Sequence, residues 1–177
     1  MKRFFLSVSF AILFSFLLLT FGCYTTSYYK MLEPVTVDTK KYQVMEITDV
    51  ENYVPQVFSQ ESCNRLKKRL VAATKEKTQR FKEIFEVSEL TKDVSASDVL
   101  VFKPTVVGFE PGSGAKRFFV GFGAGKALLE MKLDLFDKSS GEKIGATILT
   151  SEAMMAGTNV FRPMAQQFVV FIDRFIK

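Results

Sequence analysis

The 177-residue chain has the length of a single domain, and an apolar N-terminal segment raises its hydrophobic content to 47%. The formal net charge is +5, from 24 basic and 19 acidic residues that are interspersed without a basic block. A nucleic-acid-binding protein needs a concentrated cationic face, so we exclude that class. The chain has no histidine, which excludes Ser-His-Asp and Cys-His catalytic sets and removes the commonest transition-metal ligand. We therefore expect neither a cofactor nor a metal site.

Residues 1–22 are predicted to be a secretory signal peptide. Two cations are followed by an uncharged run from Phe4 to Phe21, which fits the apolar core of a signal peptide. Gly22 then precedes Cys23, the arrangement that the lipoprotein-processing peptidase cleaves once the thiol carries a diacylglyceryl group. We therefore expect Cys23 to be acylated and to anchor the protein to membrane lipid. The alternative is an uncleaved membrane anchor, because a spanning helix needs about twenty residues.

Residues 23–41 are predicted to be the lipidated N-terminus and a tether. The segment is polar and aromatic, contains Pro34 and shows no helical period. Tyr24 stands directly after the cysteine, where many bacterial lipoproteins that stay in the inner membrane have Asp. We expect a protein of the cell envelope, lipid-anchored at the outer membrane rather than the inner one.

The globular domain is predicted to start with a strand and a helix. Tyr42 to Asp49 is rich in β-forming residues. Ser59 or Ser62 could cap a helix that runs to about Phe81. Its apolar positions recur at three- and four-residue steps: Cys63, Leu66, Leu70 and Ala73. Its charged residues are expected to form a solvated face: Lys67, Lys68, Arg69, Lys75 and Glu76.

Two further strands are predicted in the middle of the chain. The first is Phe85 to Leu90 and the second is Asp98 to Phe109. Pro104 lies within the second strand and cannot donate a ladder hydrogen bond. It therefore favours an edge position or a bulge in the second half of that strand.

A hairpin is predicted next. Its first strand alternates an inward leucine-rich row with charged residues, and Glu130 and Asp134 are interpreted as a solvated pair, not a catalytic one. Asp137 to Gly141 is a turn, and Ile144 to Thr150 returns as the antiparallel neighbour. The inward row consists of Leu129, Met131, Leu133 and Leu135.

A C-terminal helix completes the prediction, with Pro163 tolerated in its first turn. Its apolar stripe consists of Phe161, Met164, Ala165, Phe168, Phe171, Ile172 and Phe175. Residues 42–177 are therefore expected to form one two-layer α+β domain, with two amphipathic helices on a mixed, mostly antiparallel sheet. The first strand could pair in parallel, and the strand order is not predicted.

A glycine-rich segment, Pro111 to Gly125, separates two predicted strands. The first interpretation is conformational, because glycine permits positive φ and tight bends between strands. The second is an anion or partner contact formed with backbone amides; its candidate residues are Lys116, Arg117, Gly121, Gly123 and Gly125. The third is an aromatic tip, including Phe118 and Phe122, that contacts lipid or a partner.

The same segment carries a family resemblance. Arg117, Gly121, Gly123 and Gly125, a strand, and then Asp137 and Gly141 together resemble a family of bacterial envelope lipoproteins catalogued as a domain of unknown function. Ser97 to Leu100 is also similar to that family's entry into a strand. The resemblance covers roughly residues 42–177. It implies the fold and the compartment, but no activity.

These observations favour a lipid-anchored binding or assembly factor that acts through protein–protein contacts and is not an enzyme. Its partners would be membrane lipid, through acylated Cys23, and another envelope protein. The alternative is a carrier or sensor of an apolar or anionic small molecule. A hydrolase without histidine is a distant third. The oligomeric state is not predicted.

Overall fold

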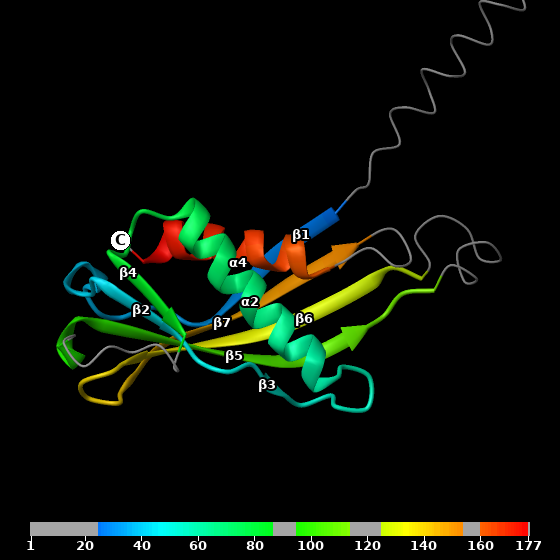
Figure 1. Ribbon diagram of the computed structural model, residues 1–177, viewed down its shortest axis with the longest axis horizontal. Helices are drawn as coiled ribbons and strands as arrows, with labels where there is room; N and C mark the ends of the chain where they lie inside the picture. The colour runs from blue at the N-terminus through cyan, green and yellow to red at the C-terminus, as the bar shows by residue number, and fades with distance from the viewer. Residues whose placement is uncertain (1–24, 87–94, 114–124, 154–159, 177) are drawn as a thin grey trace, which may run out of the picture.

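The computed structural model describes residues 25–86, 95–113, 125–153 and 160–176. This part of the chain forms a mixed seven-stranded sheet with two helices packed on one of its faces (Figure 1). The predicted two-layer α+β fold with a mixed sheet is confirmed.

The sheet has the strand order β1-β7-β6-β5-β2-β4, and the short strand β3 also pairs with β5. Three neighbouring pairs of strands are antiparallel: β1 with β7, β7 with β6, and β6 with β5. Strand β2 is parallel to both β4 and β5, and β3 is parallel to β5. The strands are β1 (Thr25–Glu33), β2 (Val44–Ile47), β3 (Glu51–Asn52), β4 (Glu83–Glu86), β5 (Val99–Glu110), β6 (Ala127–Asp137) and β7 (Lys143–Ala153). The α-helices are α2 (Gln60–Lys77) and α4 (Phe161–Phe175), and the 3-10 helices are η1 (Thr39–Lys41) and η3 (Ala96–Asp98).

The prediction of a tether over residues 23–41 is corrected, because Thr25–Glu33 forms strand β1 of the sheet. Thr25–Glu33 pairs along β7 in an antiparallel register, with Thr25 opposite Ala153. Only Tyr29 and Met31 of this strand pack against the hydrophobic core. Two inward apolar residues on an edge strand give a weak alternation, which explains why the segment looked irregular in the sequence.

Helix α2 begins where the sequence predicted, with Ser59 as N-cap accepting a hydrogen bond from the backbone N–H of Ser62 at 3.2 Å. The prediction that Lys67 belongs to the solvated face of this helix is wrong, because its side chain is buried. Its ammonium bonds to Asp49 at 2.8 Å and lies 3.4 Å from Glu86. Burial opposes the charged form of Lys67, but the two carboxylates outweigh it and raise the pKa of the ammonium.

Strand β5 is central, so the predicted edge position for its proline is wrong. The carbonyls of Phe102 and Val106 accept hydrogen bonds from Thr48 and Tyr53, each at 3.0 Å. Alternation along the strand turns the nitrogen of Pro104 toward the same side, at the interruption between β2 and β3. The missing N–H therefore costs no ladder bond. The alternative prediction of a bulge is confirmed by a register shift between Val106 and Gly108.

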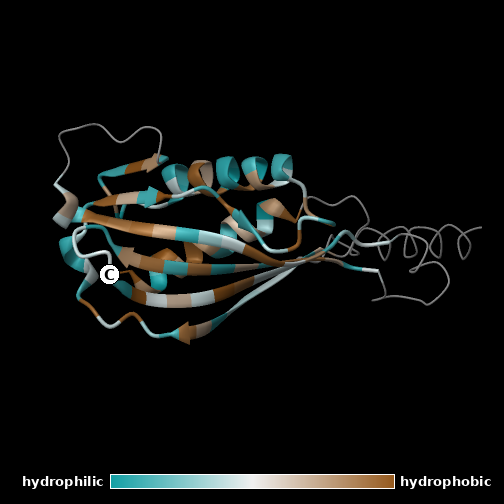
Figure 2. Ribbon diagram, turned by 90° about the horizontal axis from the view of Figure 1, so that it is seen from below, coloured by the Kyte–Doolittle hydropathy of each residue, from teal (hydrophilic) through white to brown (hydrophobic). Residues whose placement is uncertain are grey.

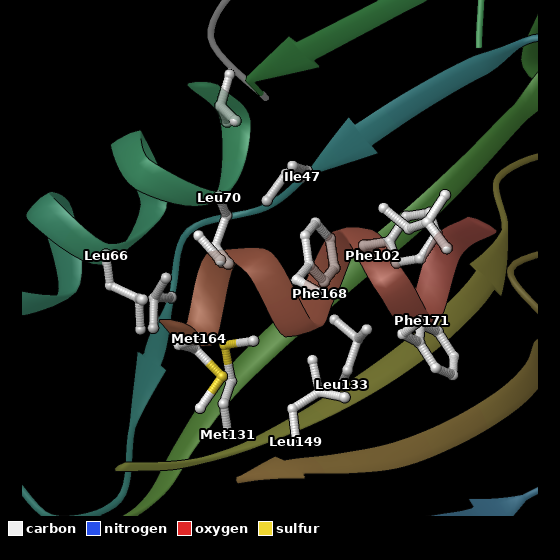
Figure 3. Packing of buried hydrophobic residues seen from close by; sticks show 14 of the residues in the cluster. Ile47, Leu66, Leu70, Phe102, Met131, Leu133, Leu149, Met164, Phe168 and Phe171 are labelled. Carbon is white, nitrogen blue, oxygen red and sulfur yellow. The ribbon is translucent and has the colours of Figure 1, made fainter. Parts of the chain in front are cut away.

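The core lies between the sheet and the two helices. Bands of hydrophilic and hydrophobic residues alternate along many of the strands and helices in Figure 2. Phe168 of α4 packs edge to face on Phe102 of β5, with ring centroids 5.6 Å apart. Figure 3 shows the side chains that fill this layer, among them Leu66, Leu70, Met131, Leu133, Leu149, Met164 and Phe171. The inward row predicted for β6 and the helical stripe predicted for α4 are confirmed as core.

We expect Phe168→Ala to lower the free energy of unfolding by about 3–5 kcal/mol, because it leaves a cavity in a fully buried layer. Urea denaturation of the full chain, followed by circular dichroism, measures the change. Val170→Ala on the same helix is the control, because Val170 is 49% exposed and its truncation should cost at most about 0.5 kcal/mol. Equal losses for the two variants would contradict this account of the core.

Candidate functional site

Asp137 lies at the end of β6, and its buried carboxylate is the shared acceptor of a cluster of polar groups. Its Oδ2 accepts hydrogen bonds from the ammonium of Lys41 at 2.6 Å and from the hydroxyl of Tyr42 at 2.7 Å. Its Oδ1 accepts from the backbone N–H of Ser139 at 2.8 Å and of Ser140 at 3.2 Å. The side chain therefore joins the β6–β7 turn to the segment that leads into β2.

This cluster gives the Asp137 and Gly141 positions of the family pattern a structural role. The N–H of Gly141 donates to the carbonyl of Asp137 at 2.9 Å, and Gly141 has a φ of +70°, which favours glycine. The ammonium of Lys41, with the hydroxyls of Ser139 and Tyr42, holds the pKa of Asp137 far below its usual range. Its carboxylate is therefore a fixed anion at neutral pH, which suits a structural anchor and not a general acid.

Most of the predicted site residues lie outside the described part of the chain. They are Cys23, Lys116, Arg117, Gly121 and Gly123. The signal peptide of residues 1–22 and the aromatic tip at Phe118 and Phe122 lie outside it too.

The two ends of the glycine segment are described, and they lie together. The N–H of Ser113 donates to the carbonyl of Gly125 at 3.0 Å, and Gly125 has a φ of +72°. Gly112 has a φ of +75°, and a Cβ there would lie 2.9 Å from the nitrogen of Ala127. Both glycines are therefore required by backbone geometry, as the conformational interpretation predicts.

The face of the sheet opposite the helices carries ion pairs in place of an apolar cover. The carboxylate of Asp134 forms ion pairs with the ammonium groups of Lys132 at 2.8 Å and Lys143 at 2.9 Å, and Lys143 also pairs with Glu33 at 2.8 Å. Burial raises the pKa of Asp134, but the two ammonium groups outweigh it, so the net shift is downward. The expectation that Asp134 is solvated is corrected, because it is buried within these pairs, whereas Glu130 is partly exposed.

Strand β1 forms one edge of the sheet, and no other described strand pairs with its outer side. Tyr29 packs on Phe175 of α4, with ring centroids 5.2 Å apart, so alternation turns Tyr28 to the opposite face. Tyr28 is 50% exposed and Leu32 is 42% exposed. This β1 edge, Thr25–Glu33, combines unpaired backbone with exposed apolar side chains, which suits pairing with another chain.

Within the described ranges, no group of three or more Cys, Asp or Glu residues could hold a metal ion. Cys63 is a free, buried thiol, and burial raises its pKa, so its prediction as a core residue is confirmed. Among the described helices, none combines the length and the apolar character that crossing a membrane requires.

The chain belongs to a family whose model, "Domain of unknown function (DUF4410)", matches residues 35–158. The predicted membership in a domain of unknown function is therefore confirmed. The matched span includes Asp137 and Gly141, the turn positions of the pattern. No curated protein matches the chain.

Solved structures share the fold at low sequence identity. A substituted form of the PelC dodecamer from Paraburkholderia phytofirmans has a TM-score of 0.55 at 7% identity, over 83% of this chain and 95% of that chain. A second PelC dodecamer from this organism has a TM-score of 0.53 at 10% identity, over 84% and 95%. A Xanthomonas campestris protein described as family-model DUF330 has a TM-score of 0.50 at 10% identity, over 82% and 85%. At these identities the likeness shows the fold alone.

We expect Asp137→Asn to lower the free energy of unfolding at neutral pH by about 1–3 kcal/mol, because it weakens charge-assisted hydrogen bonds. The carboxylate also predicts a pH dependence. Below about pH 4, the ordinary pKa of an unfolded Asp, the unfolded chain binds a proton that native Asp137 refuses. Wild-type stability should therefore fall as the pH drops, and the variant should lose less over the same range.

Urea titrations of both proteins at a series of pH values measure this difference. Glu142→Gln is the matched control, because Glu142 is exposed in the same turn and forms no ion pair with a described residue. Parallel acid profiles for wild type and Asp137→Asn would show that Asp137 is not the anchor.

Proposed function

We propose that the protein is a lipid-anchored component of the bacterial cell envelope that works by binding other protein chains and is not an enzyme. The observation that carries this proposal is the β1 edge. It is a nine-residue strand whose outer side pairs with no strand among the described residues, and two of its apolar side chains are exposed. Within β1 the charged residues are Lys30 and Glu33, and no other described strand covers its outer side, so the edge suits a contact with another chain.

The sequence supports the anchor. Cys23 follows an uncharged run and Gly22, and it stands two residues before the first residue of β1. An acylated Cys23 would therefore hold the β1 edge close to the membrane surface. Lipid-anchored neighbours on that surface would meet the edge at a raised effective concentration.

The solved neighbours support self-assembly as one form of this binding. The PelC structures are described as dodecamers, and this chain shares their fold. A second copy of this chain is therefore a natural first partner to test. Other envelope proteins are the second class of partner.

We expect the double variant Tyr28→Glu and Leu32→Glu to lose the protein partners of the wild type. Two carboxylates on an edge strand disfavour its burial against another chain, because they would have to be desolvated. Formaldehyde crosslinking of intact cells, followed by affinity purification and mass spectrometry, measures the partner set. The mass of each crosslinked complex distinguishes self-assembly from binding of a different chain.

Val170→Glu is the matched control, because Val170 is also an exposed apolar residue, at 49%, but lies on α4. It should keep the wild-type partners. Both variants should melt close to the wild type, since substitutions at exposed positions usually change stability by at most about 0.5 kcal/mol. An unchanged partner set in the double variant would contradict the β1 edge as the contact.

We expect Cys23→Ala to abolish incorporation of a radioactive fatty acid and to release the protein from the membrane fraction. The thiol of Cys23 is the only acceptor that the proposed anchor provides. Cys63→Ala is the control, because Cys63 is 1% exposed and should not accept lipid. Continued labelling of Cys23→Ala would contradict the anchor.

A further inference from the structure

A groove runs along the outer side of the helix layer, between α2 and α4. One part is a hollow of about 310 Å³ lined by Arg65, Lys68, Arg69, Ala72 and Phe161. The second part is a hollow of about 140 Å³ that shares Arg69 and Ala72 and extends toward Lys77 and Arg162. We call the two parts together the helix groove.

The helix groove is strongly cationic. Its lining holds five cations and one carboxylate, Glu76; the cations are Arg65, Lys68, Arg69, Lys77 and Arg162. None of the five forms an ion pair with another residue in the described ranges. This differs from the open face of the sheet, where the lysines Lys132 and Lys143 pair with Asp134. The charge of the groove is therefore available to an anion from outside the domain.

Apart from Phe161, the apolar residues that line the groove are alanines, whose small side chains leave room for an anionic group beside the cations. Ala72, Ala73 and Ala165 contribute only methyl groups to the lining. The guanidinium of Arg65 lies over the ring of Phe161, 5.8 Å from its centroid, which holds this arginine at the rim. Guanidinium groups bind phosphate oxygens through paired hydrogen bonds, so the three arginines in the groove lining suit phosphate.

Part of the groove lies beside the first turn of α4, at the end of the domain from which the anchor would leave. Thr25 lies opposite Ala153 at the end of β7, and Ser27 lies opposite Ser151. The hydroxyl of Ser151 donates to the carbonyl of Val160 at 3.4 Å, which fixes the start of α4 beside that end of the sheet. Arg162 follows in the first turn of α4. Figure 1 shows the start of β1 and the start of α4 at the same end of the molecule.

We propose that the helix groove binds the phosphate groups of anionic phospholipids on the membrane surface to which Cys23 is anchored. This inference rests on the lipid anchor of the proposed function. The lipid anchor would keep the domain close to the membrane surface, and the groove would set the orientation of the domain on that surface. Cationic clusters beside a lipid anchor add electrostatic attraction to the hydrophobic insertion of the acyl chains. The groove cations would thereby hold the helix layer against the headgroups.

The test uses full-length acylated protein in vesicles and a fluorophore on a single introduced cysteine. Ala72→Cys places the label on the exposed surface of the groove, and Ser140→Cys places it in the β6–β7 turn at the opposite end of the sheet. Cys63 is buried and Cys23 would be acylated, so neither should take the label. A nitroxide on the lipid headgroup quenches only fluorophores that lie at the surface.

We expect quenching at position 72 on vesicles of phosphatidylcholine with phosphatidylglycerol, and much less on phosphatidylcholine alone. It should disappear in about 1 M salt, which shortens the screening length from about 10 Å at 0.1 M to about 3 Å. It should also disappear when the four cations nearest the label, Arg65, Lys68, Arg69 and Arg162, are replaced by Gln. The label at position 140 should remain unquenched throughout.

Three results would overturn the proposal. They are equal quenching at position 72 on neutral and anionic vesicles, quenching that survives the four Gln substitutions, and no quenching on either vesicle. In the last case, titration with inorganic phosphate and mass analysis of crosslinked complexes show whether free phosphate or an acidic protein occupies the groove instead. The intact mass of the protein reports acylation of Cys23 separately, so failure of the anchor is distinguished from failure of the groove.

Discussion

The structure depends on one constraint: the two helices cover a single face of the sheet. Strand β6 lies near the middle of the strand order, and its inward row, Leu129 to Leu135, is fully buried under the helix layer. Burial of apolar surface is the main favourable term in folding, so this row and the aromatic stripe of α4 fix which way every strand must face. Among the described elements, no helix covers the other face or the outer side of β1. The described core therefore lies on one side of the sheet, and the ion pairs of Asp134 lie on the other.

Buried charges occur in this domain where they are paired. Asp137 lies where the inward row of β6 ends, and five donor groups from Lys41, Tyr42, Ser139 and Ser140 reach its carboxylate. Lys67 of α2 is buried and pairs with Asp49 and Glu86, and Asp134 lies between two lysines on the open face. Pairing keeps these groups charged at neutral pH and offsets the cost of removing them from water. The cations of the helix groove lack such partners among the described residues, which separates them from the structural ion pairs.

Much of the fold follows from the sequence because its long elements carry clear periods. The alternation of β6, the turn from Asp137 to Gly141 and the stripe of α4 each predict their structure directly. Strand β1 was missed because only Tyr29 and Met31 face the core, and Lys67 was missed because helical spacing alone does not show which partners other elements supply. Strand order depends on contacts between distant segments, which local periodicity does not contain. Most of the site residues predicted from the sequence lie outside the described ranges. The β1 edge and the helix groove could not be predicted, because each depends on how elements distant in the sequence are arranged in the fold.

The central claim is that the protein acts through the β1 edge while it is anchored at a membrane. The most direct measurement places a photo-crosslinking amino acid at position 28 or at position 170 of the full chain and irradiates intact cells. Both positions are about half exposed, but the first lies on the edge strand and the second on α4. We expect discrete crosslinked complexes from position 28 and few or none from position 170. Complexes of equal abundance from both positions, or none from position 28, would contradict this claim.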